Sequence, residues 1–348
     1  MKQIITGIQQ VGIGVEDIET AWKWYRTWFG TDVPVFDDEA DAELMTRYTG
    51  GSVQSRRAVL ALNMNGGGGF EIWQFTSRKP EKSSFETQFG DLGINAVKIK
   101  CRNVEDTFHL FTERKCEHLS SIHRLTDHSL CFYVTDPYGN RFQIVRGDSW
   151  FGNRNTPTGG VCGVMIGVSD IDRALPIYRD ALGFSETIYD EDGRFDDLDP
   201  LYKYRRVLLR KKEDVTGAFS RLFGDIDIEL IQSKDRQPNN IYKGRYWGDP
   251  GFIHVCFDVI DMDELQGRLE KIGFPFTVDS ASTFDMGEAS GRFSYIEDPD
   301  QTLIEFVQAH KVPVMKRWGW YINLRKRSHQ KPLPDWMLRC MSFARVKD

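Results

Sequence analysis

Alternating apolar and polar residues, each followed by residues at helical spacing, form the main pattern of the chain. Residues 10–15 alternate in this way, which is typical of a strand. Glu16 and Asp17 then suit a helix N-terminus, and Gly30 is a typical C-terminal stop. The pattern therefore predicts a strand at 10–15 followed by a helix over 18–29.

The same phrase returns later in the chain. Residues 7–30 match residues 160–183 at an offset of 153, and residues 93–101 match 251–259 at an offset of 158. Self-similarity at a fixed spacing indicates repeated structural units. The simplest explanation is a tandem duplication of a unit of about 155–160 residues, each unit containing two related sub-units.

Each sub-unit continues with further strand-like stretches. They lie at 58–64 with 70–75 and at 206–210 with 227–232, and glycine-rich or Asp-Pro turns join the last strands. The order is therefore βαβββ, four times over, and the fold class is α+β. We expect the four modules at about 4–76, 92–147, 158–233 and 250–309.

Three short sequence motifs, found in this order, are similar to those of a known family. They are the strand-to-helix phrase V-G-I-G-V-E-D-I from Val11, the helix end Y-R-x-x-L/F-G from Tyr25 and Tyr178, and the hairpin D-P-Y-G-N-R-F-Q-I from Asp136. The chain resembles the vicinal oxygen chelate superfamily (glyoxalase I, bleomycin-resistance proteins, extradiol dioxygenases). The resemblance covers about residues 4–310. It implies two open curved barrels, with one such domain at 1–150, a second at 158–310, and a basic extension at 311–348.

The resemblance also implies where metal ligands would stand, because the superfamily places one on the first strand and one on the last strand of a sub-unit. Carried over in chain order, the four pairs of positions are Gln10 and Glu71, Ala96 and Gln143, Gly163 and Glu229, and His254 and Glu305. The first and fourth sub-units thus hold two coordinating side chains each.

Two ways of pairing the sub-units remain open. The first with the fourth assembles Gln10, Glu71, His254 and Glu305, a set similar to that of eukaryotic-type glyoxalase I. Pairing in chain order would instead put Glu229 beside His254 and Glu305. Both arrangements keep His254 and Glu305. A second equivalent site is not expected, because its first-strand positions are alanine and glycine.

The four-residue set has a clear chemical meaning. Two carboxylates, an amide oxygen and an imidazole suit one octahedral divalent ion with open positions (Zn, Ni, Co, Fe, Mn or Mg). The resemblance then implies a metal-dependent lyase or isomerase that removes a proton beside a carbonyl and forms a metal-bound enediolate. Glu305 is the first choice for the catalytic base and Glu71 the second.

Other readings of these residues stay open. Each glutamate could face solvent on a half-exposed strand, and His254 alone could be a hydrogen-bonded core residue. The chain could be a metal-free protein that binds or sequesters a small molecule, as bleomycin-resistance relatives do, or a scaffold for association. An extradiol-type dioxygenase is disfavoured, because such iron sites use two histidines and a carboxylate.

Composition narrows the class of protein. The 348 residues are 40% hydrophobic and 28% charged, with a net charge of −6 and six scattered cysteines without a C-x-x-C pair. These values are typical of a globular protein with reduced thiols, and we expect a cytoplasmic location. We expect a small-molecule substrate with neighbouring oxygens, no nucleic acid, no integral membrane segment, and a monomer or homodimer.

Two polar or flexible stretches call for separate treatment. Cys116, His118, His123 and His128 are spaced like a loose zinc cluster, but the spacing fits no helical pair or tight loop, and an exposed edge is the preferred interpretation. The glycine run 66–69 lacks the Lys-Ser/Thr of a phosphate loop and predicts a flexible hairpin bordering the cavity.

The basic tail stands apart in charge. Residues 311–348 contain ten basic and two acidic residues, a net charge of +8, whereas the remaining 310 residues carry −14. We expect the tail aromatics, Trp318, Trp320, Tyr321 and Trp336, to pack back on the acidic body. Alternatives are that Lys326 or Arg327 holds an anionic part of a substrate, or that the tail lies on an anionic membrane surface.

Overall fold

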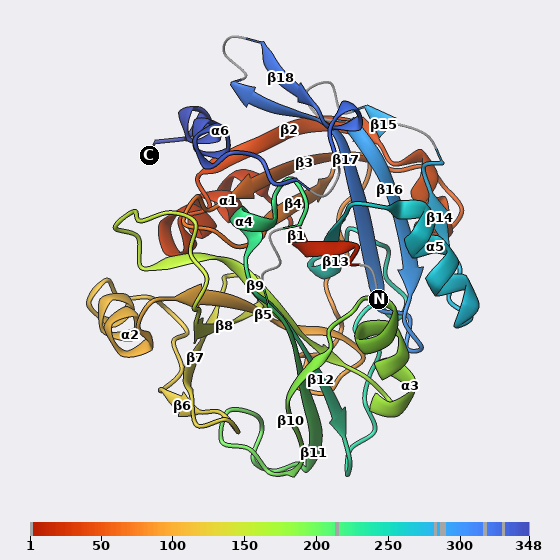
Figure 1. Cartoon of the computed structure of the whole chain (residues 1–348). Coiled ribbons are helices and arrows are strands. Elements are labelled where there is room, and N and C mark those ends of the chain that lie inside the picture. Colours follow the sequence, from red (N-terminus) through yellow and green to blue (C-terminus); the bar gives the residue numbers. More distant parts are fainter. Residues whose placement is uncertain are drawn as a thin grey trace.

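The computed structural model describes residues 3–212, 216–281, 284–285, 290–315, 319–328 and 331–347. It forms two curled sheets, which occupy the upper and lower parts of the molecule in Figure 1. The fold is the predicted α+β architecture, with helices and turns on the outside of two half-barrels.

Each of the four modules supplies strands in the predicted order. The first module contains β1 (Ile5–Gly14), α1 (Ile18–Phe29), β2 (Val33–Asp41), η1 (Glu43–Tyr48), β3 (Ser55–Leu62) and β4 (Gly69–Phe75). The second contains β5 (Gly93–Cys101), α2 (Val104–Glu113), β6 (His123–Arg124), β7 (Leu130–Thr135) and β8 (Arg141–Arg146).

The second half repeats this order and adds the tail. The third module contains β9 (Thr158–Gly167), α3 (Ile171–Leu175), η2 (Pro176–Ala181), β10 (Glu186–Gly193), β11 (Tyr204–Lys211), α4 (Ser220–Phe223) and β12 (Ile226–Ser233). The fourth contains β13 (Gly251–Val259), α5 (Met262–Lys271), β14 (Val278–Asp279), β15 (Phe284–Asp285), β16 (Ser290–Glu297) and β17 (Leu303–Met315). The tail contains β18 (Trp320–Asn323), η4 (Leu324–Lys326), α6 (Asp335–Cys340) and η5 (Met341–Ala344).

The pairing of modules is first with fourth and second with third. One sheet has the order β14-β16-β17-β13-β1-β4-β3-β2, with β15 and β18 at its side, and the other has the order β10-β11-β12-β9-β5-β8-β7-β6. Strands β1 and β13 are antiparallel neighbours in the first sheet, as β5 and β9 are in the second. Each sheet therefore takes one module from each half of the chain.

Local signals set the element ends. The Asp17 side chain accepts a hydrogen bond from the Glu19 amide at the start of α1, and Gly30 ends the helix in the left-handed region with φ 61°. The duplicate helix departs from this pattern after Leu175. Pro176 has no N–H to donate to the preceding turn, and the π-helical turn η2 begins at this residue.

A repeated contact ties modules that are neighbours in sequence. The Tyr25 hydroxyl donates to Asp136 Oδ2 at 2.7 Å, and the Tyr178 hydroxyl donates to Asp298 Oδ2 at 3.1 Å. Each aspartate also accepts backbone hydrogen bonds within its own Asp-Pro turn. The helix of one module is thus fastened to the hairpin of the next, although the two belong to different sheets.

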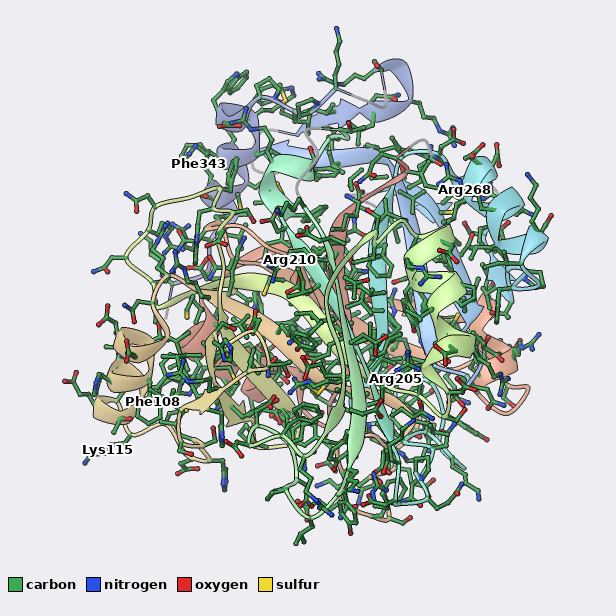
Figure 2. The ribbon with its side chains drawn as sticks, turned by 60° about the horizontal axis from the view of Figure 1, so that its bottom comes forward. Phe108, Lys115, Arg205, Arg210, Arg268 and Phe343 are labelled. Carbon is green, nitrogen blue, oxygen red and sulfur yellow. The ribbon has the colours of Figure 1, made fainter. Side chains whose placement is uncertain are left out.

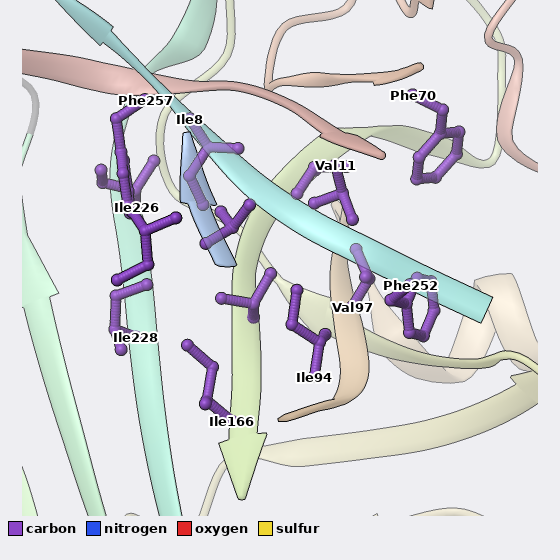
Figure 3. Packing of buried hydrophobic residues seen from close by; sticks show 14 of the residues in the cluster. Ile8, Val11, Phe70, Ile94, Val97, Ile166, Ile226, Ile228, Phe252 and Phe257 are labelled. Atoms are coloured by element: carbon purple, nitrogen blue, oxygen red, sulfur yellow. The ribbon is translucent and has the colours of Figure 1, made fainter. Parts of the chain in front are cut away.

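The main core lies between the two sheets. Figure 3 shows Ile8 and Val11 of β1 with Ile94 and Val97 of β5 and Ile166 of β9, all at most 5% exposed. Because these strands are central in both sheets, one apolar cluster joins all four modules.

The glycine run 66–69 lies in the predicted hairpin, between the antiparallel strands β3 and β4, but it is packed into this junction, so its expected place beside the cavity was wrong. All four residues are buried. The Gly68 amide donates to the Val161 carbonyl at 2.7 Å, and the Gly160 amide donates to the Gly66 carbonyl at 2.8 Å. The absence of side chains lets the two backbones approach each other.

The tail packs on the body through leucines rather than tryptophans. Leu333 and Leu338 are buried in a cluster with Leu222 and Phe223 of α4. Trp320 and Trp336 are exposed and stack on each other, with ring centroids 5.9 Å apart, so this part of the expectation was wrong. Trp318 lies outside the described residues.

Candidate metal centre

Four strands of the first sheet bring the predicted residues to one place. Gln10 lies on β1, Glu71 on β4, His254 on β13 and Glu305 on β17. His254 Nε2 lies 3.0 Å from Glu305 Oε2 and 3.4 Å from Glu71 Oε2, and Gln10 Nε2 donates to Glu305 Oε2 at 3.4 Å. Glu229 lies in the other sheet, so the structure does not bring it to His254.

The cluster is largely buried. His254 is fully buried, Gln10 is 4% exposed and Glu305 is 7% exposed. Burial would lower the pKa of His254, but the negative charges of Glu305 and Glu71 outweigh it and raise the pKa to about 9. The imidazolium is thus the counter-ion of the two carboxylates, and a divalent cation at this place would displace its proton.

The donor set fits a divalent metal ion. Ligand atoms of Glu71, His254 and Glu305 lie within 4.8 Å of one another, and among the described residues no other group of three or more His, Cys, Asp or Glu does so. His254 Nε2 contacts the two carboxylates, whereas Gln10 Oε1 is buried without a hydrogen-bond partner in the described part of the chain. Buried polar atoms normally have partners, so the unpaired amide oxygen favours a ligand at the centre of the cluster.

A cavity of about 430 Å³ leads to the cluster. Gln10, Glu71 and Glu305 line it, and the rest of the lining is mostly aromatic or aliphatic, with several charged side chains among them. The aromatic and aliphatic residues include Phe36, Leu60, Trp73, Trp247, Phe293 and Tyr295. A mainly apolar cavity with a few convergent polar groups is typical of a small-molecule site.

Two aromatic residues, which also contact each other, pack against the histidine. The Trp247 ring is stacked on the imidazole at 6.4 Å and 15°, and the Tyr295 ring meets it edge-on at 5.5 Å. Trp247 comes from the segment between β12 and β13, where Trp247-Gly-Asp-Pro-Gly repeats Phe89-Gly-Asp-Leu-Gly at the offset of 158. The sequence pattern did not single out Trp247, although this repeat could have pointed to it, nor Tyr295, which lines the cavity from β16 three positions before Asp298.

The histidine- and cysteine-containing stretch from Cys116 to His128 forms no such cluster. His118 and His128 have positive φ values of 54° and 67°, and His128 is exposed. This agrees with the expected exposed edge. No helix among the described residues has the length and apolar character needed to cross a membrane.

Comparisons with known proteins agree with the fold. Two models of the glyoxalase/bleomycin resistance protein/dioxygenase superfamily match the chain, one at residues 7–144 and the other at 163–295. The chain belongs to this superfamily. No curated protein matches the sequence.

Solved structures show the same architecture at low identity. Glyoxalase I from Zea mays is 15% identical with a TM-score of 0.54, over 87% of this chain and 92% of that one. A proposed dioxygenase from Bacillus subtilis is 14% identical with a TM-score of 0.58, over 88% of this chain and 86% of that one. At such identities the likeness concerns the fold alone.

Proposed function

We propose that the chain is a metal-dependent lyase or isomerase of glyoxalase-like type. The observation that supports it most is the convergence of Gln10, Glu71, His254 and Glu305, three of which line one cavity. One divalent ion would be held by these four side chains. When bound, it would supply Lewis-acid chemistry, polarising a substrate carbonyl and stabilising the negative charge that develops there.

The protein's own residues would position the substrate and move the proton. The aromatic walls would bind its apolar part and exclude water. Glu305 would take the proton from the carbon beside the carbonyl, leaving an enediolate, and would return it to the neighbouring carbon. Glu71 faces the same cavity and is the second choice for this base.

The first experiment is elemental analysis of the purified, tag-free chain after chelation and refilling with Mn, Fe, Co, Ni or Zn. We expect about one tightly bound ion per chain, and its loss in the double variant His254→Ala/Glu305→Ala, because two of four ligands are gone. The exposed His109 on α2 gives a matched control, and His109→Ala should keep the ion. Unchanged metal content in the double variant would contradict the proposal.

A second experiment addresses the chemistry. The metal-loaded chain would be incubated with 2-oxo hemithioacetals and α-hydroxy thioesters that carry deuterium on the carbon beside the carbonyl, and the position of the label followed by NMR. We expect the wild type to move the label to the neighbouring carbon or release it to solvent, and Glu305→Gln, which keeps an oxygen donor but removes the base, to leave it in place. Metal binding with the label unmoved in every such substrate would point to other chemistry.

The rival function is a metal-free protein that binds an aromatic or cationic ligand. The aromatic walls of the cavity favour it. A chain that takes up no ion from any of the five metals, yet binds such ligands, would establish the rival. A dioxygenase is a third candidate, but the cluster contains one histidine rather than two.

A further inference from the structure

The second sheet carries a buried polar cluster at the place equivalent to the candidate metal centre. Strand pairing defines the equivalence. In the first sheet Gln10 pairs with Cys256, and Cys256 pairs with Glu305; in the second, Gly163 pairs with Lys98, and Lys98 pairs with Gln143. Lys98 and Gln143 therefore hold the positions of Cys256 and Glu305.

The equivalence extends to the other two strands. Glu71 pairs with Gly12 in the first sheet, and Glu229 pairs with Met165 in the second. Gly12 pairs in turn with His254, and Met165 with Ala96. The positions of Gln10, Glu71, His254 and Glu305 are taken in the second sheet by Gly163, Glu229, Ala96 and Gln143. Only one carboxylate, Glu229, and one amide, Gln143, are therefore present there.

The other two positions show a compensated exchange of side-chain size. In the first sheet Gln10, a long residue, pairs with Cys256, a short one. In the second sheet Gly163 pairs with Lys98, so the long residue is on the other strand of the pair. A Cβ on Gly163 would stand 2.5 Å from the Asp227 carbonyl oxygen and 3.0 Å from Lys98 Cδ, so the glycine accommodates both the neighbouring backbone and the lysine. The second sheet is thus packed around a lysine at this place and has fewer candidate ligands than the first.

A second exchange of the same kind lies beside it. His254 faces Gly12 in the first sheet, whereas in the second Ala96 faces Met165, and both of the latter are fully buried. In the first sheet the large side chain, His254, is on β13. In the second sheet the large side chain, Met165, is on β9, the strand equivalent to β1. The volume of an imidazole is therefore filled from the other strand by an apolar chain.

The ammonium group of Lys98 lies at the centre of the cluster. Its Nζ is 2.8 Å from Glu229 Oε2 and donates to Gln143 Oε1 at 2.5 Å, and the side chain is 2% exposed. Arg206 Nε donates to Glu229 Oε1 at 2.8 Å, and its Nη1 donates to Asp197 Oδ1 at 2.7 Å. Two cations and two anions make a neutral, fully buried quartet.

We propose that the second half-barrel contains a primary-ammonium site that the chain fills with its own Lys98. The ammonium takes the position equivalent to the centre of the four-residue cluster in the first sheet and supplies the cation that Glu229 and Gln143 require. It gives the second half-barrel a structural role and prevents a second divalent ion from binding there. The inference does not depend on the function proposed for the first half-barrel, because it concerns different residues.

The ionisation of the quartet agrees with this assignment. Burial would raise the pKa of Glu229, but the charges of Arg206 and Lys98 outweigh it and lower the pKa to about 2. Burial likewise opposes the charged form of Lys98, and the charge of Glu229 outweighs it and raises the lysine pKa. Both groups are therefore charged at neutral pH.

Chemical rescue tests the ammonium site directly. Lys98→Ala removes the atoms of n-propylammonium, so we expect a fall in melting temperature on the order of 5 °C. Added n-propylammonium should then raise the melting temperature by about 2–4 °C at tenfold excess over its Kd, because it binds only the folded state. The wild type and Lys98→Met, whose side chain fills the space, should not respond. An equal response of all three proteins would overturn the proposal.

A double-mutant cycle keeps the proposal testable if Lys98→Ala does not fold. Lys98→Met leaves one uncompensated negative charge in the quartet, and Glu229→Gln leaves one uncompensated positive charge. The double variant is neutral again, so it should melt at a higher temperature than either single variant. A double variant that melts below the less stable single variant would show that the charge of Lys98 is not what Glu229 requires.

Metal analysis of the double variant separates this inference from the proposed function. Lys98→Met/Glu229→Gln leaves Gln10, Glu71, His254 and Glu305 untouched. It should therefore bind as many Mn or Zn ions per chain as the wild type. An additional ion in Lys98→Ala, but not in Lys98→Met, would also support the ammonium as the group that blocks metal from this half.

Discussion

Gly12 makes room for the histidine of the candidate metal centre. A Cβ at this position would collide with the His254 ring, since its nearest neighbour would be His254 Cε1. Gly12 lies directly opposite His254 on the neighbouring strand and is itself buried. The need for glycine here comes from close packing across the strands rather than from a special backbone angle.

Gly12→Ala should therefore disturb the centre. We expect a loss of stability of about 1–3 kcal/mol from overpacking, and a clear loss of metal because the imidazole must move. Elemental analysis and thermal unfolding would measure the two effects. Gly267 on α5 is the matched control, since nothing lies within 4 Å of a Cβ placed there. Gly267→Ala should keep the metal and stabilise the helix by up to about 1 kcal/mol.

At the scale of single residues, the sequence predicted the candidate ligands but not their surroundings. Gln10, Glu71, His254 and Glu305 followed from their places in repeated strands. Lys98 did not, because lysines alternating with Val97 and Ile99 are typical of a strand with one solvent-facing side. That side becomes interior when the sheet curls, and only then does the lysine meet Glu229.

Among the elements, β17 links the candidate site to the tail. It runs from Leu303 to Met315, beyond the predicted end of the fourth module, and pairs with β18. Lys311 and Val312 line the cavity that leads to Glu305. The tail thus begins as a wall of the candidate site, whereas the sequence pattern indicated a separate extension.

The rest of the tail is anchored by a few apolar side chains. Leu338 on α6 is 1% exposed, whereas Phe343, five residues later, is 79% exposed and stands at the outer edge of the molecule in Figure 2. We expect Leu338→Ala to lower the free energy of unfolding by about 2–5 kcal/mol, because it opens a cavity against α4. Phe343→Ala should change it by less than about 0.5 kcal/mol. Chemical denaturation of both variants would measure the difference, and equal effects would mean that the tail is not anchored through Leu338.

Helix and strand positions were predictable because their signals are local. The cap at Asp17, the stop at Gly30 and the strands around Glu71 and Glu229 need only neighbouring residues. The π-helical turn that begins at Pro176 was not predicted, since residues 160–183 repeat the strand-to-helix pattern of residues 7–30, and a proline where the first copy has Lys23 does not by itself specify a π-helical turn.

The whole molecule is held together by an apolar cluster that ignores module boundaries. Ile8 and Val11 of the first sheet lie with Ile166 and Ile228 of the second (Figure 3). Tyr25 and Tyr178 add hydrogen bonds that cross between the sheets. Separating the two half-barrels would expose this cluster to water, so neither half-barrel has a complete core of its own.

We therefore expect one cooperative unfolding transition rather than two. Calorimetric and van't Hoff enthalpies should agree, and Ile166→Ala should move the entire transition to lower temperature. Differential scanning calorimetry would test this. Two resolved transitions, with only one of them shifted by Ile166→Ala, would show that the half-barrels unfold independently.

The sequence by itself determined the four repeated βαβββ modules, their helix caps and turns, and the positions where metal ligands could stand. These features depend on side-chain period and local hydrogen bonding, which a linear pattern records. The tertiary structure alone decided that the first module pairs with the fourth and the second with the third. This choice brings Gln10 and Glu71 to His254 and Glu305, and Lys98 to Glu229. It rests on contacts between strands far apart in the chain, whose free energy depends on packing volume and buried charge rather than on any local signal.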